Sequence, residues 1–230
     1  MITLALETSA KSASVALMRD GTLLAQTVQH AGLTHSTTLL PMIHTLLEGH
    51  GITRDDISRI AVAHGPGSFT GIRIGVSTAK GLACALDVPL VGVSSLLAMA
   101  HQALHLGDGI ICPVMDARRD QVYHARFRAE RGELTRLTDD CAIAIADLFA
   151  TLDSPTPPVF LGDGAGICLT YADANGQAAT ILPDHLVYQT AWGVAMAAQH
   201  MPDACHHTVN PHYIRPPQAE RERIEKENMI

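Results

Sequence analysis

The stretch HGPGSFTGIRIG, residues 64–75, is the strongest motif of this chain. It follows a short apolar run at 60–63 and precedes a helical pattern at 70–86, so it predicts a glycine-rich turn from a strand into a helix. The first amides of a helix lack partners within the helix and carry partial positive charge, so such a turn can hold an anion. A purely structural turn is the alternative interpretation. No Gly-Lys-Ser/Thr follows, and Thr70 stands where a dinucleotide fingerprint needs its third glycine.

Strand-like and helix-like segments alternate along the rest of the chain. The Asp20-Gly21 pair between two β-prone runs predicts a hairpin near the start. Strands are expected at 2–6, 14–18, 22–28, 60–63, 88–93, 110–115, 122–128, 134–137 and 159–161. Helices are expected at 36–48, 70–86, 95–105, 147–152 and 190–201. This order of elements predicts the α/β class.

The two halves of the sequence are similar in pattern. An apolar strand ends at Glu7 and a turn follows at Gly21, and a second apolar strand ends at Asp116 with a turn at Gly132. Each half then has a strand followed by a glycine cluster. This pattern is either the ordinary recurrence of α/β units or a duplication. A duplication would build a two-lobed, actin-like (ribonuclease-H-like) fold, with mixed sheets flanked by helices and a nucleotide cleft between the lobes.

The glycines at 107 and 109 suggest the boundary between the lobes. We expect an N-terminal lobe at 1–106 that carries the dimerisation helices, and a smaller lobe at 107–205. The segment 206–230 is expected to pack back in part and to end in a loose tail.

Carboxylates and glycines at strand ends form a candidate vestigial nucleotide or anion site. Carboxylates in such positions can hold Mg²⁺ beside phosphates, although they are also common in ordinary turns. Asp163 is the third acid that closes a strand, after Glu7 and Asp116. The residues assigned to the site are Glu7, Gly65, Gly67, Ser68, Asp116, Gly162 and Gly164.

The helix expected at 70–86 carries small residues at a regular spacing. Gly71, Gly75 and Ala79 are four residues apart and share one face, with Ile72 and Val76 on the adjacent face. Small side chains let a second helix approach closely. This face therefore either packs inside the chain or contacts another subunit.

Composition limits the classes of function. The formal net charge is −7, from 16 basic and 23 acidic side chains, and an acidic chain binds phosphate backbones poorly by itself. The five cysteines include no Cys-x-x-Cys pair, which favours reduced thiols in a cytosol over a disulfide framework. The apolar runs are too short to span a membrane.

Histidines give no clear metal site. His101 and His105 are four residues apart on an expected helix, the spacing of a metal-ligand pair. No third ligand stands beside them, and a chain with 13 histidines has such pairs by chance. His206, His207 and His212 are interpreted in the same way, so no metal site is predicted.

Six segments resemble, in the same order, those of one protein family. The run at 65–75 is the most specific of them. The others are ITLALETS at 2–9 with SVAL at 14–17, THSTTLLP at 34–41, GVSSL at 92–96, DARRDQVY at 116–123 and PHYIR at 211–215. The family is TsaB, also called YeaZ, the bacterial partner subunit in threonylcarbamoyladenosine synthesis on tRNA. The resemblance covers nearly the whole chain, although Glu7 replaces a more usual Asp.

The resemblance implies an actin-like fold and a non-catalytic, cytoplasmic scaffold. TsaB proteins form homodimers in isolation and pair with the catalytic paralogue TsaD, and the ATPase TsaE joins them. The complex transfers a threonylcarbamoyl group to N6 of adenosine 37 in tRNAs that read codons starting with A. The family likeness further implies that ATP and metal bind to partner subunits and that this chain alone binds no cofactor. It would meet tRNA only through the complex, with no membrane contact.

The family likeness also indicates an interface. Pairing in the family uses the helices expected here at 36–48 and 70–86. The implied interface residues are Leu39, Leu40, Ile43, Leu47, Gly71, Ile72, Gly75, Val76 and Ala79.

One comparison with the catalytic paralogue bears on activity. That paralogue holds its metal with a His-x-x-x-His pair placed just after a Gly-Val, and the matching positions here are Ser95 and Met99, which do not suit that metal. An independent ATP-dependent enzyme of the actin-like class is the alternative hypothesis. It is motivated by Glu7, Asp116 and the glycine cluster at 162–166.

Overall fold

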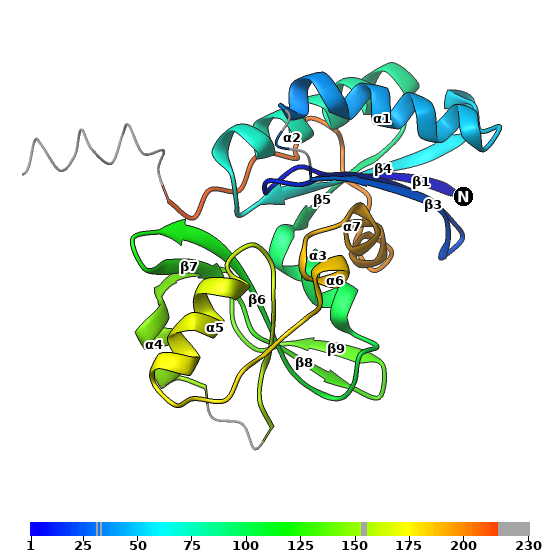
Figure 1. Cartoon of the computed structure of the whole chain (residues 1–230). Helices are drawn as coiled ribbons and strands as arrows, with labels where there is room; N and C mark the ends of the chain where they lie inside the picture. Colours follow the sequence, from blue (N-terminus) through cyan, green and yellow to red (C-terminus); the bar gives the residue numbers. More distant parts are fainter. Residues whose placement is uncertain (31, 33, 153–155, 216–230) are drawn as a thin grey trace, which may run out of the picture.

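The computed structural model describes residues 1–30, 32, 34–152 and 156–215 of the chain. Within these residues the strands form two sheets, and each sheet makes up one lobe together with its helices (Figure 1). The two-lobed α/β architecture expected from the sequence is therefore present.

The N-terminal sheet has the strand order β3-β2-β1-β4-β5. Its strands are β1 (Ile2–Glu7), β2 (Ala13–Arg19), β3 (Thr22–Gln29), β4 (Ile57–Gly65) and β5 (Leu90–Ser94). β1 pairs antiparallel with β2 and parallel with β4. The β2–β3 hairpin turns at Asp20 and Gly21, as expected, and both residues have positive φ angles, 47° and 83°.

Helices cover both faces of this sheet. α1 (His35–Gly49) and α2 (Phe69–Leu86) pack on one face, where Leu6, Val62 and Ile72 are fully buried. α7 (Ala191–Ala198) and α3 (Ser95–Ala103) pack on the other face, and α3 also contributes side chains to the core of the second lobe. A short 3-10 turn, η1 (Arg54–Asp56), leads into β4.

The second sheet has the order β10-β7-β6-β11-β12. These strands are β6 (Gly109–Arg118), β7 (Gln121–His124), β10 (Cys141–Ala144), β11 (Val159–Leu161) and β12 (Thr180–Ile181). A hairpin of β8 (Phe127–Glu130) and β9 (Glu133–Arg136) pairs with the beginning of β6. The helices of this lobe are α4 (Ile145–Ala150), α5 (Ala165–Ala174) and α6 (Asp184–Val187).

The strand expected at 122–128 is interrupted rather than wrong. β7 and β8 both pair antiparallel with β6, and the pairing of Phe127 with Ile111 continues the register set by His124 and Val114. The two pieces differ in their outer neighbour, since β10 lies beside β7 and β9 beside β8. The break at 125–126 therefore divides one strand beside β6 into two pieces, of which β7 pairs with β10 and β8 pairs with β9.

The topology supports the interpretation as a duplication. Both sheets repeat the same sequence of pairings, two antiparallel followed by two parallel. The turn at Arg131 and Gly132 has φ angles of 53° and 79°, nearly those of Asp20 and Gly21. β4 and β11 hold the same place in their sheets, and each leads through a glycine turn into a helix, α2 or α5.

The expected boundary at 205 is wrong. A boundary there places α7 in the second lobe, but α7 packs on the N-terminal sheet. The Arg59 guanidinium of β4 donates to the carbonyl oxygens of Ala198 at 2.8 Å and Met201 at 2.6 Å. The chain then stays with this lobe, because Ala204 pairs with Leu90. The segment beyond 205 packs back on the N-terminal lobe as far as Tyr213, and the expected tail beyond Arg215 lies outside the described residues.

Candidate functional site

A cavity of about 510 Å³ lies where the two lobes meet the C-terminal segment. The first lobe contributes the loop after β1 and the glycine turn before α2, and the second lobe contributes the end of β6 and the turn before α5. The lining residues that matter for its chemistry are Ser9, Lys11, Gly67, Ser68, Asp116, Arg118, Asp163 and Arg215. The glycine turn of the first lobe and two carboxylates of the second lobe, Asp116 and Asp163, therefore line one cleft.

Glu7, at the end of β1, lies beneath this cleft rather than in its wall. Its side chain is completely buried, Oε1 accepts a 2.5 Å hydrogen bond from the amide of Ser9, and Oε2 has no hydrogen-bond partner among the described residues. Burial raises the pKa of Glu7 to about 7, and the negative charge of Asp163 adds to the rise. The surroundings of Glu7 thus place the pKa of its carboxyl group close to neutral pH.

The other two carboxylates, Asp116 and Asp163, both interact with groups of their own chain. Burial raises the pKa of Asp163, and its Oδ1 accepts a 3.3 Å hydrogen bond from the amide of Asp116. The carboxylate of Asp116 accepts a hydrogen bond from the amide of Arg118 at 2.7 Å and lies 3.4 Å from the guanidinium of the same residue. A cation is therefore already present beside Asp116.

The glycine turn before α2 is filled by its own chain. The amide of Ser68 donates a 2.6 Å hydrogen bond to the carbonyl oxygen of Ser9, and the Ser68 hydroxyl caps α2 by accepting from the amide of Gly71 at 3.2 Å. A Cβ on Gly67 would overlap the Ser9 carbonyl oxygen, and one on Gly65 would overlap that of His212. The Ser68 amide, one of the amides expected to face an anion, therefore binds the Ser9 carbonyl oxygen instead.

Close backbone contacts also explain why the second lobe has glycine at 162 and 164. A Cβ on Gly162 would overlap the carbonyl oxygen of Val114, and one on Gly164 would come within 3.0 Å of the carbonyl carbon of Met115. Both contacts are with β6. These glycines let the turn between β11 and α5 pass close to β6, so close backbone packing explains them without a ligand.

The segment 211–215 joins the two lobes, a role that its sequence pattern does not predict. Tyr213 stacks on Phe69 of α2 with ring centroids 4.6 Å apart, and its hydroxyl accepts a 3.0 Å hydrogen bond from Arg73. Two residues later, Arg215 donates a hydrogen bond to the side chain of Gln121 at the start of β7. The only sequence signal was the PHYIR run itself.

The residues expected at a partner interface are mostly inside the lobe. Buried members of that set are Leu39, Ile43, Gly71, Ile72, Gly75, Val76 and Ala79. A Cβ on Gly71 would overlap the carbonyl oxygen of Thr8, and one on Gly75 would overlap the Thr8 hydroxyl. The expectation that the small residues of α2 present a face to another subunit is therefore corrected, because that face packs on Thr8, directly after β1, and on β4 of its own chain.

The outer surface of α1 and α2 has a different composition. On α1, Leu40 is 54% exposed and Leu47 is half-buried, and both border a shallow groove. On α2, Ser77, Gly81 and Ala85 are exposed and four residues apart, and a Cβ on Gly81 would meet no atom within 4 Å. We call these five residues the outer helical face. Ser77, Gly81 and Ala85 recur every four residues in the sequence. The inward-facing Gly71, Gly75 and Ala79 have the same spacing, so the spacing alone does not tell which row is exposed.

The positions that match the paralogue's metal ligands are interior. Ser95 begins α3 and is completely buried, and Met99 packs in the core of the second lobe. His101 lies on the same helix, where burial lowers its pKa to about 4, and its ring stacks on that of His200 with centroids 6.1 Å apart. The residues present at 95 and 99 do not fit a hard or borderline metal ion.

Sequence comparisons identify relatives whose names state a role in tRNA modification. The family model of TsaD, tRNA N6-adenosine threonylcarbamoyltransferase, matches residues 28–219. The tRNA threonylcarbamoyladenosine biosynthesis protein TsaB of Bacillus subtilis is 40% identical over 163 residues, which cover 70% of this chain and 71% of that protein. The TsaB of Escherichia coli is 38% identical over 128 residues, 55% of each chain.

Solved structures agree with the sequence comparisons. YeaZ from Pseudomonas aeruginosa has a TM-score of 0.79 and 27% identity, over 92% of this chain and 99% of that one. The ethanolamine utilization protein EutJ from Carboxydothermus hydrogenoformans has a TM-score of 0.54 at 14% identity, over 85% and 89% of the two chains, which shows the actin-like fold alone. In the described part of the chain, every helix is too short or too polar to cross a membrane. Fold, segment order and relatives together show that this chain belongs to the TsaB (YeaZ) family.

Proposed function

We propose that this chain is a non-catalytic scaffold subunit of the cytoplasmic machinery that makes threonylcarbamoyladenosine in tRNA. In this proposal it binds a TsaD-type catalytic paralogue and a TsaE-type ATPase, and the transfer to N6 of adenosine 37 in tRNAs reading ANN codons takes place on the paralogue. The observation that carries the proposal is the burial of Ser95 and Met99 at the positions where the paralogue places its metal ligands. The names of the relatives support the pathway.

The outer helical face is the surface that we assign to pairing. It combines an exposed leucine on α1 with a row of small residues on α2, so a partner helix could approach closely while burying apolar surface. The same face would serve the homodimer of the isolated chain. It replaces the inward-facing residues Gly71, Gly75 and Ala79 as the proposed interface.

The cleft supports a role without bound nucleotide. The amide of Ser68 binds the Ser9 carbonyl, Asp116 is paired with Arg118, and Glu7 is sealed below the surface. ATP and metal would then bind to the partner subunits, and tRNA would be contacted through the complex.

The test is genetic and biochemical. The gene is deleted in its host, threonylcarbamoyladenosine in bulk tRNA is measured by mass spectrometry, and the deletion is complemented with this chain. We expect the nucleoside to disappear and to return on complementation. In reconstitution with the TsaD- and TsaE-type proteins of the same organism, omitting this chain should abolish transfer. A normal amount of threonylcarbamoyladenosine in the tRNA of the deletion strain would refute the proposal.

An independent ATP-dependent enzyme of the actin-like class is the second candidate. It is favoured by the convergence of Asp116, Asp163, Lys11 and Arg215 on one cavity between the lobes. The purified chain alone would then bind ATP with Mg²⁺ and hydrolyse it. Calorimetry that detects no binding at millimolar nucleotide would exclude this candidate.

A further inference from the structure

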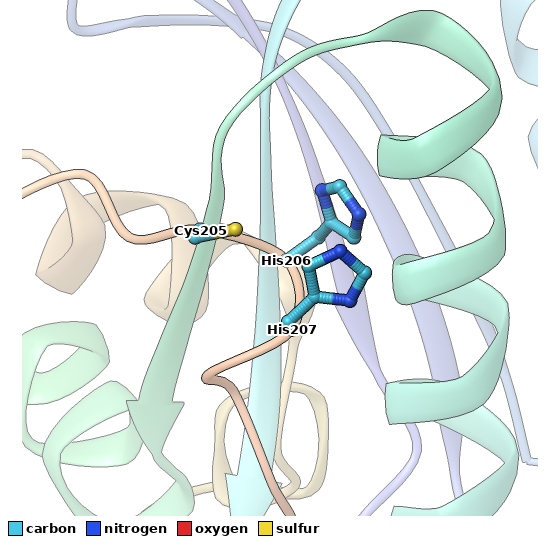
Figure 2. Close-up of side chains that lie close together, drawn as sticks. All are labelled: Cys205, His206 and His207. Carbon is cyan, nitrogen blue, oxygen red and sulfur yellow. The ribbon is translucent and has the colours of Figure 1, made fainter.

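We propose that Cys205, His206 and His207 form a binding site for one Zn²⁺ or a similar borderline transition-metal ion. The ligand atoms of the three side chains, one sulfur and two imidazole nitrogens, all lie within 4.8 Å of one another. Figure 2 shows the sulfur of Cys205 directed toward the two rings, whose centroids are 4.0 Å apart. In a tetrahedral zinc site such ligand atoms are about 3.3–3.6 Å apart, so small side-chain rotations would bring them into bonding range.

The backbone explains how three consecutive residues can converge. The carbonyl oxygen of Cys205 accepts a 2.9 Å hydrogen bond from the amide of Thr208 and a 2.8 Å hydrogen bond from the Thr208 hydroxyl. This closed turn bends the chain, whereas in an extended chain neighbouring side chains point to opposite sides. The turn thus brings the three ligands to one side.

Both ends of the turn are anchored to the N-terminal lobe. Before it, the amide of Leu90 donates a 3.2 Å hydrogen bond to the carbonyl oxygen of Ala204. After it, Val209 is buried in the lobe core, and the Lys80 ammonium donates to the side chain of Asn210 at 3.1 Å. A site held by a supported backbone loses less conformational freedom when it binds an ion, which favours affinity.

The donor set selects the class of metal. A thiolate with two imidazoles suits Zn²⁺ and copper, whereas Mg²⁺ and Ca²⁺ prefer oxygen ligands. Cys205 and His207 are exposed, so a fourth coordination position faces solvent. The nearby carboxylate of Asp203 is engaged elsewhere, because it lies 2.6 Å from the guanidinium nitrogen of Arg59. Among the residues that the structure describes, the site therefore has three protein ligands and leaves one position open.

This proposal is independent of the tRNA function, and its test uses metal alone. The chain is purified without a histidine tag, stripped with a chelator and titrated with Zn²⁺ in competition with a chromophoric chelator. Co²⁺ is then substituted to give an optical spectrum. We expect one ion per chain and a near-ultraviolet charge-transfer band from thiolate to cobalt.

Substitutions assign the ligands. We expect Cys205→Ser to remove the cobalt band, and both it and His207→Ala to weaken Zn²⁺ binding by at least about tenfold, the lower end of the effect of losing even a supporting residue. The matched controls are Cys84→Ser and His44→Ala, an exposed cysteine and an exposed histidine outside the group. Circular dichroism establishes that each variant is folded.

Either of two results would overturn the assignment. The first is the lack of stoichiometric binding and of the cobalt band in the unaltered chain. The second is binding that survives unchanged in folded Cys205→Ser and His207→Ala, or that falls equally in Cys84→Ser and His44→Ala. Tight binding that is lost only with the cysteine and histidine of the turn would establish the site.

Discussion

The hydroxyl of Thr8 donates a 2.8 Å hydrogen bond to the carbonyl oxygen of Gly71, so the end of β1 and the first turn of α2 are in direct contact. This contact requires that the helix carry no side chain at Gly71 and Gly75, where a Cβ would overlap Thr8. The small residues of α2 therefore join the helix to its own sheet. The same contact helps position the glycine turn beside the cleft.

The first prediction follows from this contact. We expect Gly71→Ala to lower the free energy of unfolding by roughly 1–3 kcal/mol, because the new methyl group would be forced against the Thr8 backbone. Gly81→Ala is the matched control on the same helix, where the methyl group meets open space. It should raise stability by up to about 1 kcal/mol through helix propensity. Urea unfolding of both variants measures the difference, and equal effects would refute the packing argument.

The second prediction tests the outer helical face. Leu40→Glu should weaken binding to the TsaD-type partner by about 30-fold or more, because it places a charge on an apolar contact of the kind that carries interface energy. Its stability should change little, since Leu40 is 54% exposed. Ile167→Glu in the second lobe, where the isoleucine is 39% exposed, is the control and should bind normally. Size-exclusion chromatography and calorimetry measure pairing. Normal binding by folded Leu40→Glu would remove this surface from the proposal.

The third prediction concerns the buried carboxyl of Glu7. Its folded-state pKa of about 7 lies above the ordinary value of 4.5, so the folded chain holds a proton that the unfolded chain releases as pH rises between these values. Glu7 therefore lowers the free energy of unfolding increasingly as pH rises from about 4.5 to 7, and by up to about 3 kcal/mol above pH 7. Glu7→Gln should be more stable than wild type at pH 8 and close to it at pH 4.

The control for Glu7 is an exposed glutamate. Glu48 is 70% exposed on α1, and Glu48→Gln makes the same chemical change at the protein surface. The free energy of unfolding is measured for all three proteins at pH 4, 6 and 8. A Glu7→Gln profile parallel to that of wild type would show that Glu7 is ionised in the folded protein at neutral pH.

The fourth prediction concerns acid sensitivity in the second lobe. Burial lowers the pKa of His124 on β7 to about 4 from the ordinary 6.5. The unfolded chain therefore binds the extra proton as pH falls from about 6.5 to 4, and up to about 3 kcal/mol of stability is lost in that window. His124→Gln should flatten the slope of unfolding free energy against pH there. His185→Gln, at an exposed histidine, is the control, and equal slopes in His124→Gln and wild type would contradict the assignment.

Local features were predictable from the sequence because their causes are local. The Asp20-Gly21 hairpin follows from the positive φ angles that these two residues tolerate, and the Ser68 cap follows from its place before a helical pattern. The glycine turn before α2 and the strand followed by a glycine cluster in each half were also evident. The short elements β10, α5, β12 and α6 were not predicted, since brief apolar runs lack a periodic pattern long enough to identify them.

Most strands, helices and turns followed from the local pattern of the sequence, and the resemblance of six segments indicated the family. Only the tertiary structure decided which way these segments face. The spacing of Gly71 and Gly75 is the same as that of Ser77, Gly81 and Ala85, and only the packing of the inner row against Thr8 and β4 distinguishes it from the outer row. Likewise, Cys205, His206 and His207 match no standard ligand spacing and converge only because their turn is closed. Periodicity specifies relative positions on one element, whereas burial and convergence depend on the elements packed around it.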